Sequence, residues 1–242
     1  MRERIGIFAF CTYALCFFSF LIIICGRNER TVTSSATVKN NELIIVIDAG
    51  HGGSDGGSVA LDGTNEAVLN LEISKKLDDI LSVLGFNTVM TRSDENSLGE
   101  ANSSIRNEKV TDIHNRMDIM NSFENCFFVS VHQNYYQGSS SWGTQVFYSG
   151  NNEQSEILAF DIQQSVVSLL QNENKRQIKK SGSSIYLLDK AVKPAVLVEC
   201  GFISNENDLK NLKDEIYQKE LSFCVTNGII DYLTEKGAYY GF

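Results

Sequence analysis

Two histidines and a glutamate each follow an apolar run in this chain. The run IIVIDAGH delivers His51, FFVSVHQN delivers His132, and AVLVECGF delivers Glu199. Two neutral imidazoles and one carboxylate, with a fourth position left to water, form a catalytic zinc site in many hydrolases. If Glu199 instead takes the proton of that water, a different carboxylate must complete the set of metal ligands.

Glu66 is the candidate for that third ligand. It follows the glycine-rich stretch GHGGSDGG, residues 50–57, and begins a segment with helical apolar periodicity. Its carboxylate can therefore fold back towards His51. A glutamate in the first turn of a helix can also serve only to compensate the helix dipole, and the residues alone leave both interpretations open.

The glycine-rich stretch permits three competing interpretations. Residues 52–56, GGSDG, match the G-x-S-x-G elbow of serine hydrolases. That elbow requires a sharp strand–serine–helix turn, whereas the helix expected here begins about ten residues later. A dinucleotide-binding fingerprint fails because its third glycine would fall on Asp55. The last alternative is a simple glycine turn that carries a surface histidine.

Strand and helix patterns alternate along the rest of the chain. We expect strands at 43–49, 86–92, 126–132, 144–150, 185–189 and 195–201. We expect helices at 65–85, 112–123, 155–171, 206–214 and 216–237, with a long surface loop at 93–111. This alternation predicts an α/β, three-layer fold with a central mostly parallel (mixed) β-sheet flanked by helices on both faces. In such sheets, functional groups collect at the carboxyl ends of the strands.

The N-terminal segment differs from the remainder. Residues 5–26 carry no charged side chain, and a run of about 20 apolar residues is long enough to cross a bilayer. The run ends in Ile24-Cys25 without a small-x-small cleavage site. We therefore expect a signal anchor at 1–26, a linker at 27–42 and a catalytic domain at 43–242. A cleaved signal peptide and lipidation of Cys25 are the alternatives.

Charge and cysteine usage exclude some classes of protein. The formal net charge of −9 argues against a nucleic-acid partner, because phosphate binding requires a basic face. The cysteines after the N-terminal segment, Cys126, Cys200 and Cys224, are odd in number and lie in apolar stretches. We interpret them as small buried side chains and not as a disulfide framework. The remaining histidine, His114, is expected at the surface.

A resemblance to a known family joins these motifs. In order, IDAGHGGSDGG, NEAVLNL, SVHQN and VECGFISN resemble the zinc-dependent N-acetylmuramoyl-L-alanine amidases of the amidase type 3 family. The similarity extends over about residues 43–236. With its single N-terminal apolar segment, the chain looks most like the membrane-anchored, germination-specific amidases of the spore cortex.

The resemblance implies a role for each candidate residue. The family's ligands for one Zn²⁺ ion fall on His51, Glu66 and His132, and its catalytic glutamate falls on Glu199. Its two arginine positions fall on Arg92 and Arg116, which we interpret as mainly structural. Glu199 would take the proton of the attacking water and pass it to the nitrogen of L-alanine.

The resemblance also implies partners and a location. The substrate would be peptidoglycan, a glycan strand with its stem peptide, and the domain would act outside the cytoplasm, anchored to the cytoplasmic or spore membrane. An accessory activator protein is a further hypothesis. Two alternatives remain: a zinc peptidase that cuts within the stem peptide, and a non-catalytic, membrane-anchored wall-binding domain. Tyr135 and Tyr136, where relatives have small residues, would form a stacking wall or reshape the rim of the groove.

Overall fold

A computed structural model describes residues 42–100, 104–137 and 140–235 of the chain. The predicted signal anchor and all but one residue of the predicted linker lie outside the described residues, so both remain predictions. Among the helices that are described, none combines the length and the apolar character needed to span a bilayer.

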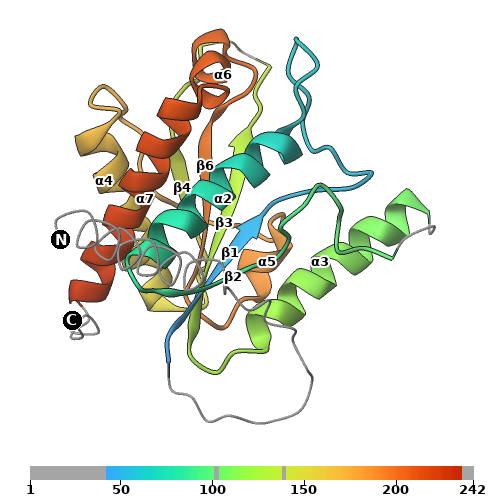
Figure 1. Cartoon of the computed structure of the whole chain (residues 1–242), viewed down its shortest axis with the longest axis vertical. Coiled ribbons are helices and arrows are strands. Elements are labelled where there is room, and N and C mark those ends of the chain that lie inside the picture. Colours follow the sequence, from blue (N-terminus) through green and yellow to red (C-terminus); the bar gives the residue numbers. More distant parts are fainter. Residues whose placement is uncertain (1–41, 101–103, 138–139, 236–242) are drawn as a thin grey trace, which may run out of the picture. The chain divides into compact units, whose positions relative to one another are not determined.

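A six-stranded sheet forms the centre of the described region, in the order β2-β1-β3-β6-β4-β5 (Figure 1). Its strands are β1 (Ile44–Ala49), β2 (Asn87–Met90), β3 (Cys126–Asn134), β4 (Gln145–Tyr148), β5 (Lys179–Lys180) and β6 (Ala195–Phe202). All neighbouring strands are parallel except β4 and β6, which are antiparallel. The carboxyl ends of β1, β3 and β6 therefore meet at one edge of the sheet.

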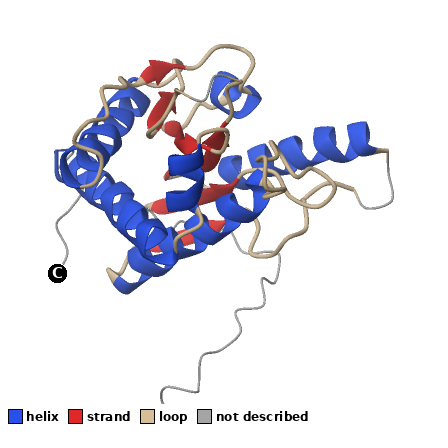
Figure 2. Ribbon diagram, turned by 90° about the horizontal axis from the view of Figure 1, so that it is seen from above, coloured by secondary structure: helices blue, strands red, loops and turns tan. Residues whose placement is uncertain are grey.

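Helices cover both faces of this sheet (Figure 2). On one face lie α2 (Glu66–Val83), α4 (Glu153–Leu169) and α7 (Glu215–Glu235), and on the other lie α3 (Ile105–Asn121) and α5 (Tyr186–Lys190). The short helix α6 (Glu206–Leu212) packs near β6 and α7. The predicted three-layer α/β fold, with its mostly parallel mixed sheet, is confirmed.

The central strands alternate between two apolar clusters. In β1, Ile45 and Ile47 pack with α2, α4 and α7, whereas Val46 packs with α3 and α5. Because successive side chains of a strand point to opposite faces, a strand covered on both faces reads as an unbroken apolar run. This is why 43–49, 126–132 and 195–201 were recognisable as strands.

Two of the predicted elements were wrong. Residues 185–189 form a helix, α5 at Tyr186–Lys190, and not a strand. A short apolar run has no period that separates strand from helix, and here Leu187 and Leu188 pack together against the sheet. The predicted loop 93–111 also ends early, because α3 already begins at Ile105.

The early start of α3 had a weak signal in the sequence. The Ser104 hydroxyl accepts a hydrogen bond from the backbone N–H of Asn107 and caps the helix. The first turns, however, expose Ile105 and Val110 to solvent, so that no apolar stripe marks them. Strand β5 was not predicted either, since two lysines at the edge of a sheet carry no strand pattern.

The predictions for the isolated residues are confirmed. Cys126, Cys200 and Cys224 are buried and form no disulfide with one another. His114 is exposed, although it lies in the middle of α3 and not at a helix start, with its ring 5.6 Å from that of Tyr186.

Candidate metal centre and active site

The carboxyl edge of the sheet brings the strand-end residues together. In the register of the sheet, Ala49 of β1 lies beside Val131 of β3, and His132 of β3 lies beside Glu199 of β6. His51 follows β1 by two residues. His51, His132 and Glu199, which lie far apart in the sequence, are therefore brought into one small region.

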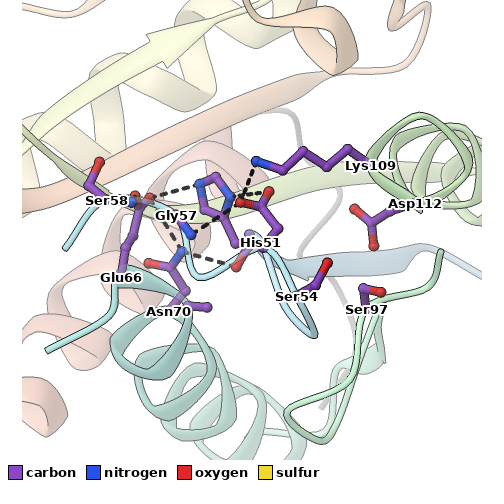
Figure 3. A network of polar contacts seen from close by, with 12 residues as sticks. His51, Ser54, Gly57, Ser58, Glu66, Asn70, Ser97, Lys109 and Asp112 are labelled. Carbon is purple, nitrogen blue, oxygen red and sulfur yellow. Dashed lines mark hydrogen bonds and ion pairs between the residues drawn. The ribbon is translucent and has the colours of Figure 1, made fainter. Parts of the chain in front are cut away.

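Three metal-binding side chains converge there. The Glu66 Oε1 atom lies 2.9 Å from His132 Nδ1 and 3.3 Å from His51 Nε2. The potential ligand atoms of His51, Glu66 and His132 all lie within 4.8 Å of one another. Figure 3 shows the Glu66 carboxylate, at the start of α2, directed towards the ring of His51.

This donor set fits a zinc ion. Two imidazole nitrogens and one carboxylate oxygen are the ligand types of catalytic zinc, and bond lengths of about 2.0–2.1 Å place tetrahedral ligands about 3.3 Å apart. The distances of 2.9 and 3.3 Å from Glu66 Oε1 to the two imidazole nitrogens are close to that spacing. Zinc-bound histidines also usually bond a carboxylate through the other ring nitrogen, and His51 Nδ1 lies 2.8 Å from the Asp55 carboxylate.

Glycines allow these side chains to approach. A Cβ atom on Gly50 would lie 2.1 Å from His132 Nε2, and one on Gly57 would lie 2.7 Å from Glu66 Oε2. Gly57 also has a φ of 67°, in the left-handed region that glycine tolerates. The glycine-rich loop therefore leaves room for the ligand cluster, which accounts for His51 standing among glycines.

The backbone at His51 is held in an uncommon conformation. Its φ of 61° is positive, and no other non-glycine residue of the described ranges shares that property. Such a conformation persists only when surrounding contacts fix it. Arg92 donates to the carbonyls of Ala49 and Gly50, at 2.8 and 2.9 Å, and Arg116 donates to those of Ala49 and His51, both at 2.7 Å.

The two arginines thus hold three consecutive carbonyls that lead from β1 into the loop. Arg116 is itself held by the buried carboxylate of Asp48, 2.5 Å from its Nη1, and by the partly buried carboxylate of Asp112, 2.7 Å from its Nε. Burial opposes ionisation of Asp48, but the charge of Arg116 and a hydrogen bond from Ser130 outweigh it and lower the Asp48 pKa. The predicted structural role of Arg92 and Arg116 is consistent with these contacts, and this role explains how His51 is positioned.

Further polar contacts orient Glu66. The backbone N–H of Gln133 donates to Glu66 Oε1 at 3.1 Å, and that of Ser58 donates to Oε2 at 2.9 Å. The Asn70 amide, one turn along α2, reaches both Glu66 Oε1 at 3.5 Å and the Gly50 carbonyl at 3.1 Å (Figure 3). These bonds fix the carboxylate without any contribution from a metal.

The proximity of these side chains shifts the pKa values of His51 and Glu66. Burial opposes protonation of His51, but the carboxylates of Asp55 and Glu66 outweigh it and raise the pKa of His51 to about 9. Burial likewise acts against ionisation of Glu66, yet hydrogen bonds from His132 and His51 hold its pKa well below the ordinary value. The site therefore favours a cationic imidazole beside a carboxylate, and a bound metal cation would replace that positive charge.

Glu199 lies beside the metal cluster in a different environment. Its Oε2 atom is buried and has no hydrogen-bond partner among the described residues. Burial raises the pKa of Glu199 to about 7; the charges of His132 and His51 oppose this increase, and the charge of Glu66 adds to it. A carboxyl group with a pKa near neutrality exchanges protons readily in both directions, as general acid–base catalysis requires.

A cleft of about 300 Å³ opens at these residues on the face that carries α3 and α5. His51, His132 and Glu199 line one part of it. Apolar side chains from α3, α5, β3 and β6 and from the N-cap of α5 line much of the rest: Ile113, Ile185, Leu187, Leu188, Leu197 and Phe128. A substrate in this cleft therefore lies against the two histidines of the candidate metal site and against the carboxyl group of Glu199.

The serine-hydrolase alternative receives no support from the contacts of Ser54. Its hydroxyl donates to Glu108 Oε2 at 2.6 Å in an exposed position, and no histidine takes part. Tyr135 and Tyr136 are exposed just after β3. Their role as a stacking wall stays a prediction.

The sequence did not reveal the residues that support the site. Asp48 stands within an apolar run, and the partners that make it important, Arg116 and Ser130, are 68 and 82 positions away. In the sequence Asp55 stands out only as the residue that breaks a nucleotide motif, although its carboxylate contacts His51 and Lys109. An acidic residue inside a buried strand was the available signal for Asp48, since such a charge needs a partner.

Comparison with known proteins extends these observations. A family model described as N-acetylmuramoyl-L-alanine amidase matches residues 45–231. The chain is 32% identical over 195 residues to the germination-specific N-acetylmuramoyl-L-alanine amidase of Bacillus subtilis, which covers 80% of this chain and 81% of that relative.

Solved structures agree with this assignment. The CwlD amidase from Clostridioides difficile, determined in complex with the GerS lipoprotein, has a TM-score of 0.77 and 35% identity, covering 79% of this chain and 98% of that one. The amidase AmiC2 of Nostoc punctiforme has a TM-score of 0.68 and 27% identity, covering 79% of this chain and 97% of that one.

Proposed function

The chain belongs to the N-acetylmuramoyl-L-alanine amidase family and is a peptidoglycan amidase, and from this premise we propose that it hydrolyses its substrate with one zinc ion held by His51, Glu66 and His132. Glu199 is the proposed general base and acid. One observation carries the proposal. Three side chains that can bind a metal converge at one point, and the buried carboxyl group of Glu199 lies beside them because Glu199 pairs with His132 in the sheet.

When bound, zinc would supply Lewis-acid chemistry that makes water more acidic and polarises a carbonyl group. The residues of the chain then divide the remaining work. Glu199 accepts the proton released by the attacking water and donates it to the leaving nitrogen of L-alanine, while the lactyl group of muramic acid keeps the new carboxylate. Asp55 and Asn70 hold His51 and Glu66 in the orientation that binding requires.

The first test combines metal analysis with analysis of the products. The full chain is incubated with purified peptidoglycan, its zinc content is measured, and the released fragments are analysed by mass spectrometry. We expect one zinc per chain and stem peptides with a free L-alanine amino terminus. Cleavage between amino acids of the stem peptide would indicate the zinc peptidase alternative. A folded protein that binds no zinc would refute the proposed metal site.

A role in the spore cortex is the finer proposal. It is supported by similarity to the germination-specific relative, and removal of the stem peptide would precede conversion of muramic acid to muramic lactam. Spores of a strain that lacks the gene should then contain little muramic lactam and germinate poorly. Normal muramic lactam in such spores would contradict the cortex role and leave the amidase activity unaffected.

We also propose that the protein acts outside the cytoplasm, anchored by residues 1–26, and that an accessory protein assists it. The structure of the related amidase in complex with a lipoprotein supports the second suggestion. Purification from native membranes tests both suggestions. Recovery in the membrane fraction with a second protein is expected, whereas a soluble protein that is fully active alone would contradict both.

A further inference from the structure

Two cationic side chains lie on the side of Glu199 opposite the candidate metal ligands His51, Glu66 and His132. We propose that Arg176 and Lys179, here called the basic flank, bind a free carboxylate of the peptidoglycan stem peptide. The inference rests on the proposed function and adds to it a direction: the peptide would extend from the metal cluster across β6 and β4 towards β5. A stem peptide carries at least its terminal carboxylate, whereas neutral sugar residues offer no such charge.

Strand register places the first cation beside the catalytic centre. Gln145 of β4 pairs directly with Glu199 of β6, and directly paired residues project from the same face of a sheet. Arg176 Nη1 donates to Gln145 Oε1 at 3.2 Å. Gln145 thus flanks Glu199 on one side, as His132 does on the other, and Arg176 lies one side chain further out.

The second cation lies on the same face. Lys179 of β5 pairs with Phe147 of β4, which in turn pairs with Leu197 of β6. The Lys179 ammonium lies 5.7 Å from the centroid of the Phe147 ring. Leu197 and Glu199 both line the catalytic cleft, so Lys179 belongs to the face on which the substrate must lie.

Arg176 is oriented without any ion pair. Its Nε donates to the Trp142 carbonyl at 2.8 Å, and its guanidinium lies 4.4 Å from the centroid of the Phe202 ring. Because Nε donates to the Trp142 carbonyl and one Nη1 hydrogen to Gln145, the Nη2 group and the second Nη1 hydrogen remain available for a carboxylate. Arg176 is partly buried and already oriented by these contacts, so its side chain loses less conformational freedom on binding than a free one.

The charges of the basic flank are not compensated within the described region. Neither Arg176 nor Lys179 forms a salt bridge with an acidic residue described in the structure. Asp208 interacts electrostatically with Arg176, but its Oδ2 atom accepts the backbone N–H groups of Gly143 and Phe202. Unpaired cations beside the catalytic centre of a chain with a net charge of −9 require a different explanation, and an anionic substrate supplies it.

The dimensions suit a short peptide. Neighbouring strands lie about 4.8 Å apart, so that β5 is about 10 Å from β6. An extended peptide advances about 3.3–3.6 Å per residue, which makes this span equal to about three residues. The basic flank would therefore contact the stem peptide within its first three residues.

The test uses two muramyl tripeptides that differ only in their carboxylates. One substrate has every peptide carboxylate free, and in the other each is converted to a carboxamide. The full, zinc-loaded chain is assayed as the wild type, as Arg176→Gln and as Lys179→Gln. The control is Lys75→Gln, which removes the same charge from an exposed position on α2.

We expect the wild type and the control to prefer the carboxylate substrate by about tenfold in kcat/KM, mainly through KM, which corresponds to about 1.4 kcal/mol. In Arg176→Gln and Lys179→Gln that ratio should fall to about threefold or less, and Arg176→Lys should restore part of it. Thermal unfolding of each variant checks that it is folded; Lys179 is exposed, which makes that variant the safer test.

The outcomes separate this inference from the function on which it rests. If the wild type releases L-alanine peptides but shows no preference between the two substrates, the basic flank is not a carboxylate site and the proposed function stands. The same conclusion follows if both variants keep the wild-type ratio. If the wild type leaves the bond to muramic acid intact in both substrates, the proposed function and this inference fail together.

Discussion

The two faces of the sheet are built in different ways. On the face covered by α2, α4 and α7, buried apolar side chains form one continuous cluster that includes Leu81. On the face covered by α3 and the short α5, the apolar cluster is smaller. It gives way to the buried pair of Asp48 and Arg116 and then to the catalytic cleft. We refer to these as the closed face and the open face.

This difference shows how stability and chemistry are distributed. The closed face supplies most of the apolar burial that holds the sheet rigid. The open face exposes strand ends and uses polar contacts to position them. Glu66 links the two, since it starts a helix of the closed face but points its carboxylate to the histidines at the sheet edge. Variants on each face should therefore affect different properties.

The largest effect is expected from Glu199→Gln on the open face. The variant should lose activity by about 10³-fold, within the range of general acid–base catalysis, while keeping its zinc. Its thermal midpoint should be unchanged or slightly higher, because an amide replaces a buried carboxyl oxygen that lacks a partner among the described residues. Turnover assays, metal analysis and calorimetry check this. Activity within tenfold of the wild type would mean that Glu199 is not the base.

Arg116→Met should affect both stability and the metal site. The substitution leaves the Asp48 carboxylate buried without its counter-charge and removes the donors to the carbonyls of Ala49 and His51. Breaking a buried ion pair costs about 3–5 kcal/mol. We therefore expect the free energy of unfolding, measured by urea denaturation, to fall by about 3 kcal/mol. Zinc binding should also become weaker.

The double variant Asp48→Asn, Arg116→Met provides the control for that experiment. Since it removes the uncompensated charge, it should recover part of the lost stability but not the metal affinity. If Arg116→Met lowered the free energy of unfolding by less than about 1 kcal/mol, the Asp48–Arg116 pair would contribute no more than a surface salt bridge. That result would contradict its role as a support for the site.

A matched pair of leucines compares the apolar contribution of the two faces. Leu81 is 0% exposed on the closed face, and Leu187, at 8%, lines the cleft of the open face. Leu81→Ala should lower the free energy of unfolding by about 3 kcal/mol, and Leu187→Ala by about 1.5 kcal/mol, because a side chain beside a cleft leaves less enclosed cavity. Equal losses, measured by chemical denaturation, would show that the open face is packed as tightly as the closed one.

The smallest effect is expected for a charge on the closed face. Burial, with help from Glu235 and Asp231, raises the pKa of Asp161 on α4 to about 6. The folded state therefore binds more protons than the unfolded state between about pH 4 and pH 6, and this group makes the protein less stable as the pH rises through that window. Asp161→Asn should add about 1 kcal/mol at pH 7.5 and almost nothing near pH 3, where the carboxyl is mostly neutral in both states. A stabilisation independent of pH would exclude the proposed cause.

The sequence was informative where one side of an element had to be apolar. Strands β1, β3 and β6 were recognised from unbroken apolar runs, and α2 and α4 from helical periodicity. The start of α3 and the whole of α5 were missed because neither has a stripe of its own: α3 buries only Arg116 and Met120, and α5 is five residues long.

The site shows the same division. His51, His132 and Glu199 stand at strand ends, where topology alone brings them together, and Glu66 starts a periodic helix. The side chains that orient them act through long-range contacts, such as Arg116 with the carbonyl of His51 at a separation of 65 positions. No local pattern encodes a contact of that kind.

The strand order has a consequence for the biosynthesis of the enzyme. Strand β6 is the last strand to be translated, yet it lies between β3 and β4 in the finished sheet. Until it inserts, β2-β1-β3 and β4-β5 are separate pieces with open edges. The proposed base, Glu199, arrives on that same strand. A nascent or truncated polypeptide that ends before β6 thus lacks both the link between the two pieces and the group that would move the proton, so hydrolytic competence begins only when the sheet is complete.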